Sequence, residues 1–424
     1  MKKIQIGIVG AGTVGSGLIQ IIKEAGDRVA ESTGIQIVVH TICDASVFIK
    51  DKYKEYNTVF DYKALIENKE IDLIVELVGG TGIAYNIVKE SLENSKTVVT
   101  ANKALLSEKG SELFSLAEKK GVEIGYEASV GGTIPIIRSI KTGLVANEFR
   151  GIYGILNGTT NFILSKMEDE NLEYSIALKH AQDLGFAEKD PSFDVEGIDT
   201  AHKVSLLAGI SFGKKINIKN IYVEGITNIS KSEIITAKQL GYRIKLLGVC
   251  KTNRGDIEAR VQPAMVPISH PLAGVRNEMN AIFLDTSYSG PLIFSGKGAG
   301  SLPTASAVFS DILFYGSRIG DKDYLEKNTF SEGNTTPHGQ ETGRYYIRFN
   351  TIDKPGVLAE IAHHLGKNNV SISTVRQDES TGETAEVIIL THKCREIDLR
   401  NSIKDIDLLS IIKSNSVVVR IEDF

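Results

Sequence analysis

The chain has 424 residues, a length that predicts about three domains. Hydrophobic residues make up 42% of it and charged residues 24%, as is typical of a soluble globular protein. The net charge of −5 gives no electrostatic reason to expect nucleic acid or an anionic membrane as a partner.

The cysteines and the first residues bear on the compartment. Cys43, Cys250 and Cys394 are far apart and form no CxxC pair, so we expect neither a disulfide framework nor a zinc site, and a reducing cytoplasm fits. The first residues, MKKIQIGIVGAG, reach glycine before a signal-peptide core forms, and no apolar run approaches a membrane span. We expect a cytoplasmic protein.

A glycine-rich turn follows the first predicted strand. Residues 3–9 (KIQIGIV) indicate a short buried strand, GAGTVG follows, and residues 14–30 indicate a helix. Between a strand and a helix, this Gly-x-Gly-x-x-Gly pattern favours a dinucleotide site over a turn without a ligand. The first glycine permits the tight turn, the second admits the pyrophosphate, and the third allows close packing. The predicted cofactor-binding residues here are Gly10, Gly12, Thr13, Val14 and Gly15.

Three more strands are predicted, at residues 35–43, 71–78 and 97–100, with helical stretches between them. This alternation predicts a doubly wound parallel sheet of the Rossmann type, whose ligand lies beyond the carboxyl ends of the strands. Thr100 and Lys103 follow one such end. Because a cation disfavours a helix N-terminus, a ligand role for Lys103 is favoured over a plain helix-start charge.

Asp44 ends the second strand, where a carboxylate commonly binds the ribose hydroxyls of NAD. It lies 29 positions after Gly15, which requires a long intervening helix and loop. The preceding residue, Cys43, is not an arginine, and the next basic residue is Lys50. The pattern leans towards NAD over NADP.

The segment 126–135, YEASVGGTIP, is too rich in glycine for a helix. Its backbone carbonyls and Glu127 could hold a hard cation such as sodium, and the alternative is a hinge between domains.

Carboxylates are concentrated in residues 186–204, FAEKDPSFDVEGIDTAHKV, which hold five of them with two lysines. From about Asp194 the spacing is helical, so Asp199 and Lys203 lie on one face. Such a group could bind an amino group while the lysine transfers a proton. A solvated helix start with an i,i+4 ion pair is the alternative that the segment alone favours.

Together, GIVGAGTVG, VVTANKALLS, EASVGGTIPII, GILNGTTNFILSKM, LGFAEKDPSFDVEGIDTAHK and GKGAGSLPTASAV resemble the homoserine dehydrogenases. The resemblance implies interconversion of aspartate β-semialdehyde and homoserine with a nicotinamide cofactor, in the route to threonine, methionine and isoleucine. It also implies a homodimer. The implied domains are a split nucleotide-binding domain, 1–133 plus about 299–330, and a mixed α/β catalytic and dimerisation domain, 134–298.

The resemblance also implies roles for individual residues. Lys203 corresponds to the acid–base lysine and Lys103 to its partner. The carboxylates that bind the substrate's amino end correspond to Glu188 and Asp199, with Asp190 and Asp194 nearby. The remaining positions are Gly185 and Gly300 near the cofactor, and Glu127, Val130, Gly132 and Ile134 around sodium.

Beyond a polar linker at 331–342, residues 343–424 give a predicted β-α-β-β-α-β order. With DKPGVLAEIAHHLGKNNVSI, it resembles an ACT domain, a module that commonly binds amino acids where two copies meet. We expect threonine as effector, with Asp353 and Gly356 at a helix N-terminus for its carboxylate and Asn368 and Asn369 for its other end. A domain that only dimerises is the alternative.

Two other functions are alternatives. Aspartate-semialdehyde dehydrogenase chemistry needs a placed cysteine nucleophile, and Cys43 is poorly located for it. A non-catalytic nucleotide-binding sensor of amino acids would not need Lys103 and Lys203. The SGKGAG run at 295–300 fails the Walker pattern and is interpreted as a loop near the cofactor, and the histidines show no metal-binding spacing.

Overall fold

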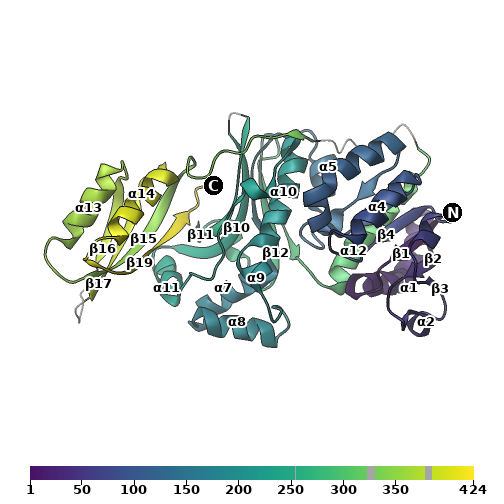
Figure 1. Cartoon of the computed structure of the whole chain (residues 1–424), viewed down its shortest axis with the longest axis horizontal. Coiled ribbons are helices and arrows are strands. Elements are labelled where there is room, and N and C mark those ends of the chain that lie inside the picture. The colour runs from purple at the N-terminus through teal and green to yellow at the C-terminus, as the bar shows by residue number, and fades with distance from the viewer. Residues whose placement is uncertain (254, 322–329, 378–383) are drawn as a thin grey trace. The chain divides into compact units, whose positions relative to one another are not determined.

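The computed structural model describes residues 1–253, 255–321, 330–377 and 384–424. The chain folds into two compact units (Figure 1). Unit 1 comprises residues 1–158, 202–218 and 278–333, and unit 2 comprises residues 159–201, 219–277 and 334–424.

A parallel sheet forms the centre of the N-terminal part of unit 1. Its strands run in the order β3-β2-β1-β4-β5-β6, which is typical of dinucleotide-binding folds, and every neighbouring pair is parallel. The predicted doubly wound fold is confirmed. The strands are β1 (Lys2–Val9), β2 (Ile35–Cys43), β3 (Asn57–Val59), β4 (Leu73–Glu76), β5 (Thr97–Thr100) and β6 (Ile124–Gly125).

Helices cover this sheet, and one of them comes from much later in the chain. The helices are α1 (Thr13–Thr33), α2 (Ile49–Lys52), α3 (Lys63–Ile66), α4 (Ile83–Glu93), α5 (Lys103–Lys120) and α12 (Ser301–Ser317). A Cβ atom added to Gly17 of α1 would lie 2.6 Å from Ser301 Oγ, and one added to Gly316 would lie 2.5 Å from a methyl of Ile4. Small residues therefore let α12 pack closely on α1 and β1, and the late helix joins the nucleotide-binding core.

Unit 1 also contains an antiparallel set of strands, β13 (Pro291–Lys297), β12 (Met279–Thr286) and β7 (Phe149–Ile155). The interpretation of residues 295–300 as a loop is therefore wrong for its first half, because residues 295–297 pair with β12. Shorter elements of the same unit are η1 (Glu127–Ser129), α6 (Ile136–Arg138), η2 (Ser139–Gly143) and β8 (Lys214–Lys215).

Unit 2 is built on a long hairpin, β10 (Tyr242–Asn253) and β11 (Asp256–Pro267). Its other elements are α7 (Gly158–Glu170), α8 (Tyr174–Asp183), α9 (Ser192–Val195), β9 (Tyr222–Val223), α11 (Lys231–Gln239) and η4 (Pro271–Gly274), with η3 (Ile218–Asn220) at its edge. The helix expected from about Asp194 is in fact two, α9 and α10 (Ile198–Phe212), because Gly197 between them takes a left-handed φ of 86°.

The C-terminal part of unit 2 has the predicted β-α-β-β-α-β order. It consists of β15 (Thr342–Ile352), α13 (Val357–Lys367), β16 (Ile372–Gln377), β17 (Thr384–Thr391), the short β18 (Cys394–Arg395), α14 (Glu396–Asp407) and β19 (Ile412–Ile421). The strand order β19-β15-β17-β16 is antiparallel, as in ferredoxin-like folds. The turn expected at Thr381–Gly382 lies outside the described residues.

Two backbone links attach this C-terminal part to its surroundings. Strand β19 pairs in parallel with β11, so within unit 2 the two sheets are continuous. The segment predicted to be a plain linker also makes backbone pairs. Its first residues form β14 (Ser331–Glu332), which pairs with β8 inside unit 1, and Thr335 bridges to Ile257 inside unit 2.

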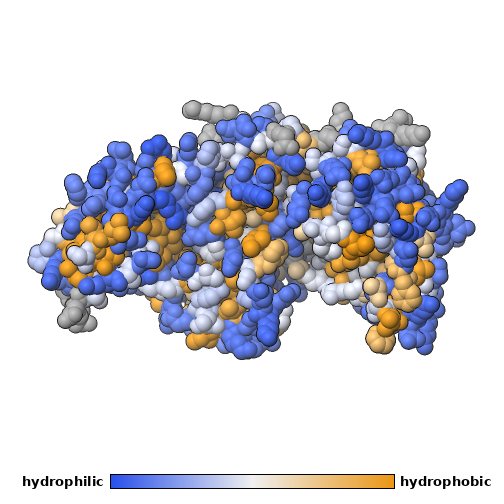
Figure 2. Space-filling view, viewed as in Figure 1, coloured by the Kyte–Doolittle hydropathy of each residue, from blue (hydrophilic) through white to orange (hydrophobic). Residues whose placement is uncertain are grey.

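No helix within the described residues combines the length and the apolar character needed to cross a membrane. The face shown in Figure 2 is mostly hydrophilic, with apolar side chains in scattered groups.

Candidate active site

The glycine-rich turn in unit 1 forms a cradle between β1 and α1. Gly10 has a φ of 99°, and a Cβ atom on Gly15 would lie 2.1 Å from the carbonyl oxygen of Gly10. At Gly12, which precedes α1, an added Cβ atom would meet nothing within 4 Å. Two glycines are thus required by close packing, while the third leaves open space at a helix N-terminus, where a pyrophosphate fits. Thr13 and Val14 open this helix.

Asp44 holds the same turn in place. Its Oδ2 accepts a hydrogen bond of 2.7 Å from Ala11 N, and its Oδ1 accepts one of 2.8 Å from Ser46 N. The carboxylate thus fastens the end of β2 to the glycine-rich turn. If Asp44 also binds the ribose hydroxyls of the cofactor, as expected, it must do so with the lone pairs of Oδ1 and Oδ2 that these two hydrogen bonds do not use.

The ends of β4 and β5 are joined by a buried carboxylate that sequence reasoning missed. Glu76 accepts from Thr100 Oγ1 at 2.6 Å and from Val78 N at 2.8 Å. Because the Thr100 hydroxyl is fully buried and donates inward, a cofactor contact by this residue would have to come from its backbone. Asn102 caps α5 by accepting from Leu105 N, and Lys103 is the first residue of that helix, at the edge where the ligand is expected.

Helix α10 carries the acid–base candidate. Lys203 is buried, and its Nζ donates a hydrogen bond of 2.5 Å to the carbonyl oxygen of Leu156, the residue after β7. The adjacent His202 is also buried, and its Nδ1 lies 2.6 Å from Ser107 Oγ on α5. The helices that carry Lys103 and Lys203 are therefore in direct contact within unit 1.

The acidic segment 186–204 divides into buried and exposed carboxylates. Asp199 is buried in the first turn of α10, one turn before Lys203. In unit 2, Thr159 Oγ1 at the start of α7 lies 2.7 Å from the carbonyl oxygen of Phe186 and 3.2 Å from Asp194 Oδ2. This contact holds the acidic segment against the N-terminus of α7.

Glu188 and Asp190 are exposed. The backbone of Glu188 is held by Gln182, whose Nε2 donates to its carbonyl oxygen at 3.1 Å. Asp190 Oδ1 accepts from both the hydroxyl and the amide of Ser192, and these bonds lower the pKa of Asp190. Asp190 thus stabilises the first residue of α9, which is a structural role in addition to the expected contact with substrate.

The remaining positions expected near the cofactor are glycines with left-handed φ values. Gly185, with a φ of 77°, ends the turn after α8, and Gly300, with a φ of 126°, precedes α12. Beside Gly300, Ser301 Oγ donates to the carbonyl oxygen of Thr13 at 2.6 Å, so the start of α12 lies beside the start of α1.

The expected cation loop lies in unit 1 between β6 and α6. The carboxylate of Glu127 accepts from Ile137 N and Arg138 N, each at 2.8 Å, so it caps α6, and a cation would meet backbone oxygens rather than this side chain. Among the described residues we find no hydrogen-bond donor to the carbonyl oxygens of Val130 and Gly132, while that of Ile134 accepts from Ile136 N. Unpaired buried carbonyls suit a hard cation.

A buried acidic pair supports this loop. Asp311 of α12 accepts from Glu127 N at 2.8 Å and pairs with Arg138 at 2.5 Å. Burial raises the pKa of Glu127 to about 7 and that of Asp311 to about 6. Sequence reasoning missed this cluster, because its members are separated by as many as 184 positions.

Lys245 of β10 is a second feature missing from the sequence-based predictions. It is fully buried in unit 2, and its Nζ donates to Asn161 Oδ1 at 2.9 Å and to the carbonyl oxygen of Val275 at 2.5 Å. Burial lowers the pKa of Lys245 to about 7. This lysine fixes the first turns of α7, the helix whose start contacts the acidic segment.

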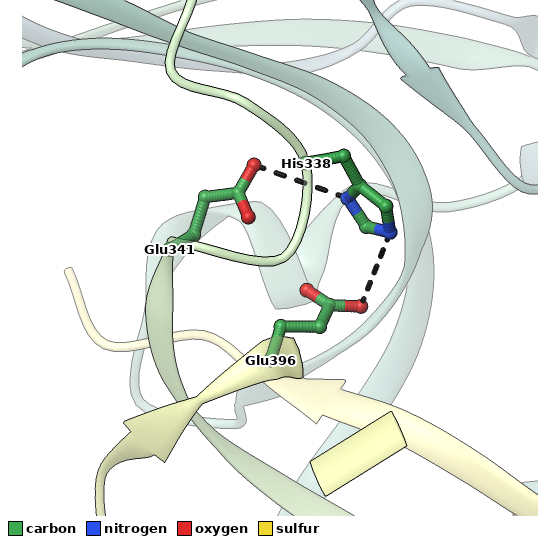
Figure 3. Close-up of side chains that lie close together, drawn as sticks. All are labelled: His338, Glu341 and Glu396. Atoms are coloured by element: carbon green, nitrogen blue, oxygen red, sulfur yellow. Dashed lines mark ion pairs between the residues drawn. The ribbon is translucent and has the colours of Figure 1, made fainter. Parts of the chain in front are cut away.

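His338, Glu341 and Glu396 form a cluster in unit 2 (Figure 3). Nδ1 of His338 lies 3.9 Å from Glu341, and Nε2 lies 4.0 Å from Glu396. The two ring nitrogens face different carboxylates, and Arg400 already pairs with Glu396 Oε1 at 3.0 Å. A single metal ion would use only one of these nitrogens and would meet the arginine charge. We therefore interpret the cluster as an ion-pair junction between the linker and α14.

The four predicted effector-binding residues do not lie close together within one chain. Asp353 and Gly356 precede α13, whereas Asn368 and Asn369 follow it. Eleven residues of helix span about 16 Å, too far for one threonine to reach both ends. The predicted site therefore requires one half from each of two copies of the domain, in keeping with the expectation that the ligand binds where two copies meet.

The glycine cradle, the parallel sheet and Lys103 beyond its carboxyl edge are the features of a dinucleotide-dependent oxidoreductase. Family models match residues 10–127 as the NAD-binding domain of homoserine dehydrogenase, 135–313 as homoserine dehydrogenase, and 345–407 as an ACT domain. The chain belongs to the homoserine dehydrogenase family and is an NAD(P)-dependent enzyme with a C-terminal ACT domain.

Whole-length relatives agree. The homoserine dehydrogenase of Neisseria gonorrhoeae is 38% identical, with 100% of this chain and 99% of that protein covered. The homoserine dehydrogenase of Corynebacterium glutamicum is 37% identical, over 99% of this chain and 96% of that protein. Among solved structures, a homoserine dehydrogenase from Thiobacillus denitrificans superposes with a TM-score of 0.94 at 35% identity, covering 100% of this chain and 99% of that one.

Proposed function

We propose that the chain reduces aspartate β-semialdehyde reversibly to homoserine, with Lys203 as proton donor and acceptor and Lys103 as its partner. The observation that supports these roles is the position of Lys203. It is a buried lysine one turn after the buried Asp199, on a helix in contact with the helix that begins at Lys103.

The chemistry follows from the residue types. The nicotinamide cofactor, held by the cradle of Gly10, Gly12 and Gly15, supplies or accepts the hydride. Lys203 stabilises the negative charge that develops on the aldehyde oxygen and delivers a proton to it. In the reverse direction, neutral Lys203 removes the hydroxyl proton of homoserine. Glu188 and Asp199 bind the substrate's ammonium group.

The test is a spectrophotometric assay that follows NAD(P)H absorbance with the semialdehyde as substrate. Turnover to homoserine supports the proposal, and its absence with both cofactors contradicts it. The acyl-forming alternative lacks support, because all three cysteines are buried. Burial raises the pKa of Cys43 to about 11 and also raises the pKa values of Cys250 and Cys394, which leaves little thiolate for nucleophilic attack.

We also propose that NAD(H) is used at least as well as NADP(H), and that sodium occupies the loop of Glu127, Val130, Gly132 and Ile134. Asp44 beside the glycine turn supports the first proposal, since it would repel a 2′-phosphate. The unpaired carbonyls support the second. A hyperthermophilic archaeal relative, 28% identical with a TM-score of 0.63 over 74% of this chain and 98% of that one, was solved with NADPH. Parallel assays with both cofactors test the preference.

We propose further that threonine binds the ACT domain and lowers the activity of the enzyme. We also propose that the enzyme is a homodimer and is located in the cytoplasm. The free cysteines fit a reducing compartment. Two copies of the domain would bring the turn at Asp353–Gly356 of one chain to Asn368 and Asn369 of the other. Inhibition of the intact enzyme by threonine, weakened in Asn368→Ala but retained in Lys367→Ala, would support this site. Equal inhibition of both variants would contradict it.

A further inference from the structure

Helices α5 and α10 meet at a specific polar contact. Ser107 and His202 are 95 positions apart, and their Oγ and Nδ1 atoms lie 2.6 Å from each other. Ser107 is one turn beyond Lys103 on α5, and His202 directly precedes Lys203 on α10. The bond thus joins the two helices next to the two lysines.

The Ser107 hydroxyl has a single proton, so it can donate only one hydrogen bond. Ser107 Oγ also lies 3.0 Å from the carbonyl oxygen of Ala104, one turn back on α5. When the hydroxyl donates to that carbonyl, its lone pair accepts from Nδ1–H of His202. The serine is then fixed by its own helix, and the imidazole is oriented by the serine.

Packing beside the contact is incomplete. A cavity of about 30 Å³ lies along α5 and α10, and its lining includes the small residues Ser107, Ser111, Ser205 and Gly209. The lining also includes the apolar side chains of Leu106, Phe114 and Leu206, so apolar packing contributes to the contact between α5 and α10 but is not directional. The hydrogen bond supplies the directional restraint.

We propose that Ser107 and His202 are positioning residues that set the relative placement of Lys103 and Lys203. This inference rests on the proposed function, because it assumes that the two lysines act together. Displacing reacting groups by about 1 Å can lower a rate on the order of 100-fold. Loss of the contact therefore lowers turnover while leaving the glycine cradle, which is formed by a different part of unit 1, unaffected.

The experiment compares Ser107→Ala, His202→Leu and His202→Asn in the full-length enzyme. The asparagine amide reaches the position of Nδ1 and can present either a donor or an acceptor there. Ser111→Ala is the matched control, because it removes a hydroxyl from the same face of α5 and lines the same cavity. Measured quantities are kcat, the KM of each substrate and the melting temperature.

We expect kcat to fall by about 10–100-fold in Ser107→Ala and His202→Leu, with the cofactor KM within twofold and the melting temperature retained. His202→Asn should recover most of the lost kcat, and Ser111→Ala should match the parent. Full activity in both Ser107→Ala and His202→Leu would overturn the inference. So would equal losses in His202→Asn and His202→Leu, which would indicate a packing role. If Lys103→Ala and Lys203→Ala stay active, the proposed function itself has failed.

Discussion

Lys203 Nζ donates to the carbonyl oxygen of Leu156 at 2.5 Å, so the end of β7 holds the nitrogen of the acid–base candidate in one position. A carbonyl accepts a hydrogen bond from an amine and a stronger one from an ammonium group. The bond therefore orients the lysine side chain in both protonation states, which a residue acting in both reaction directions requires.

Replacing Lys203 with alanine should abolish most turnover while cofactor binding persists. General acid–base catalysis typically contributes about 10²–10⁴-fold, and the glycine cradle does not depend on this side chain. The measurement is kcat beside a fluorescence titration with NAD(P)H. Lys189→Ala, which removes an exposed lysine from the same acidic segment, is the control. A Lys203→Ala enzyme with more than half of the parental kcat would contradict the assignment.

Glu188→Leu and Asp199→Ala should impair the use of homoserine rather than of nucleotide. Each removes an acceptor for the substrate's ammonium group, and at the buried Asp199 the loss of one partner of a charge pair costs about 3–5 kcal/mol. Steady-state kinetics with each substrate varied in turn separates the two effects. Asp183→Ala, which removes an exposed carboxylate paired with Lys179 on α8, should change neither. If kcat and KM for homoserine are unchanged in either variant, the carboxylate replaced in that variant has a structural role and does not bind the substrate.

Asp44→Ser should weaken binding of both cofactors and shift the preference towards NADP(H). The weakening follows from the lost bond to Ala11 N in the glycine-rich turn, and the shift follows from the removal of a negative charge near the 2′ position. Ratios of kcat/KM for NADH and NADPH measure both. A parent enzyme that strongly prefers NADPH would show that another cation reads the 2′-phosphate.

Lys245→Met should alter the pH dependence of stability. Because burial lowers the folded-state pKa of Lys245 to about 7, the unfolded chain binds more protons between pH 7 and its ordinary pKa of 10.5. Stability of the parent should therefore gain from this group as pH rises through that window. In the variant this gain should be absent, and two buried acceptors lose their donor at about 1–3 kcal/mol each. Urea unfolding at pH 7 and pH 9 checks the difference.

Glu422→Gln should destabilise unit 2 by at most about 3–5 kcal/mol, because it removes one of the two carboxylates, Glu258 and Glu422, that pair with the buried Arg260. Glu422 Oε2 lies 2.5 Å from Arg260, and Oε1 lies 2.8 Å from Lys251. Burial opposes ionisation of Glu422, but Arg260 and Lys251 outweigh it and lower the pKa to about 2. In the parent this stabilisation is lost as pH falls towards that value. Asp423→Asn, at a more exposed carboxylate, is the control for denaturant unfolding.

The nucleotide-binding half could be predicted from sequence because its steric demands are local. Gly15 lies within one turn of the Gly10 carbonyl that a side chain would strike, so the pattern and its cause lie within six residues. The element order of the C-terminal domain could also be predicted, because alternating strands and a turn that leads into an amphipathic helix are local signals.

Other features depend on partners that are remote in sequence. Lysine and arginine are residue types typical of protein surfaces. Lys245 and Arg260 can be buried because they bind partners that are 84 and 162 positions away in the sequence. The hairpin strand β11 is buried on both faces for most of its length, which removes the alternation that marks a strand. Gly197 is a single residue whose left-handed φ splits a helix that periodicity had predicted to be continuous.

The parallel pairing of β11 with β19 also sets the order in which the chain can fold during synthesis. At about 5–20 residues per second, β11 leaves the ribosome on the order of ten seconds before β19 exists. Throughout that interval the edge of β11 at Ala264 and Met265 has open hydrogen-bonding groups, and Arg260 has Glu258 of its own strand but not yet Glu422 as a partner. Unit 2 therefore completes its fold only after synthesis of β19, close to the end of the chain.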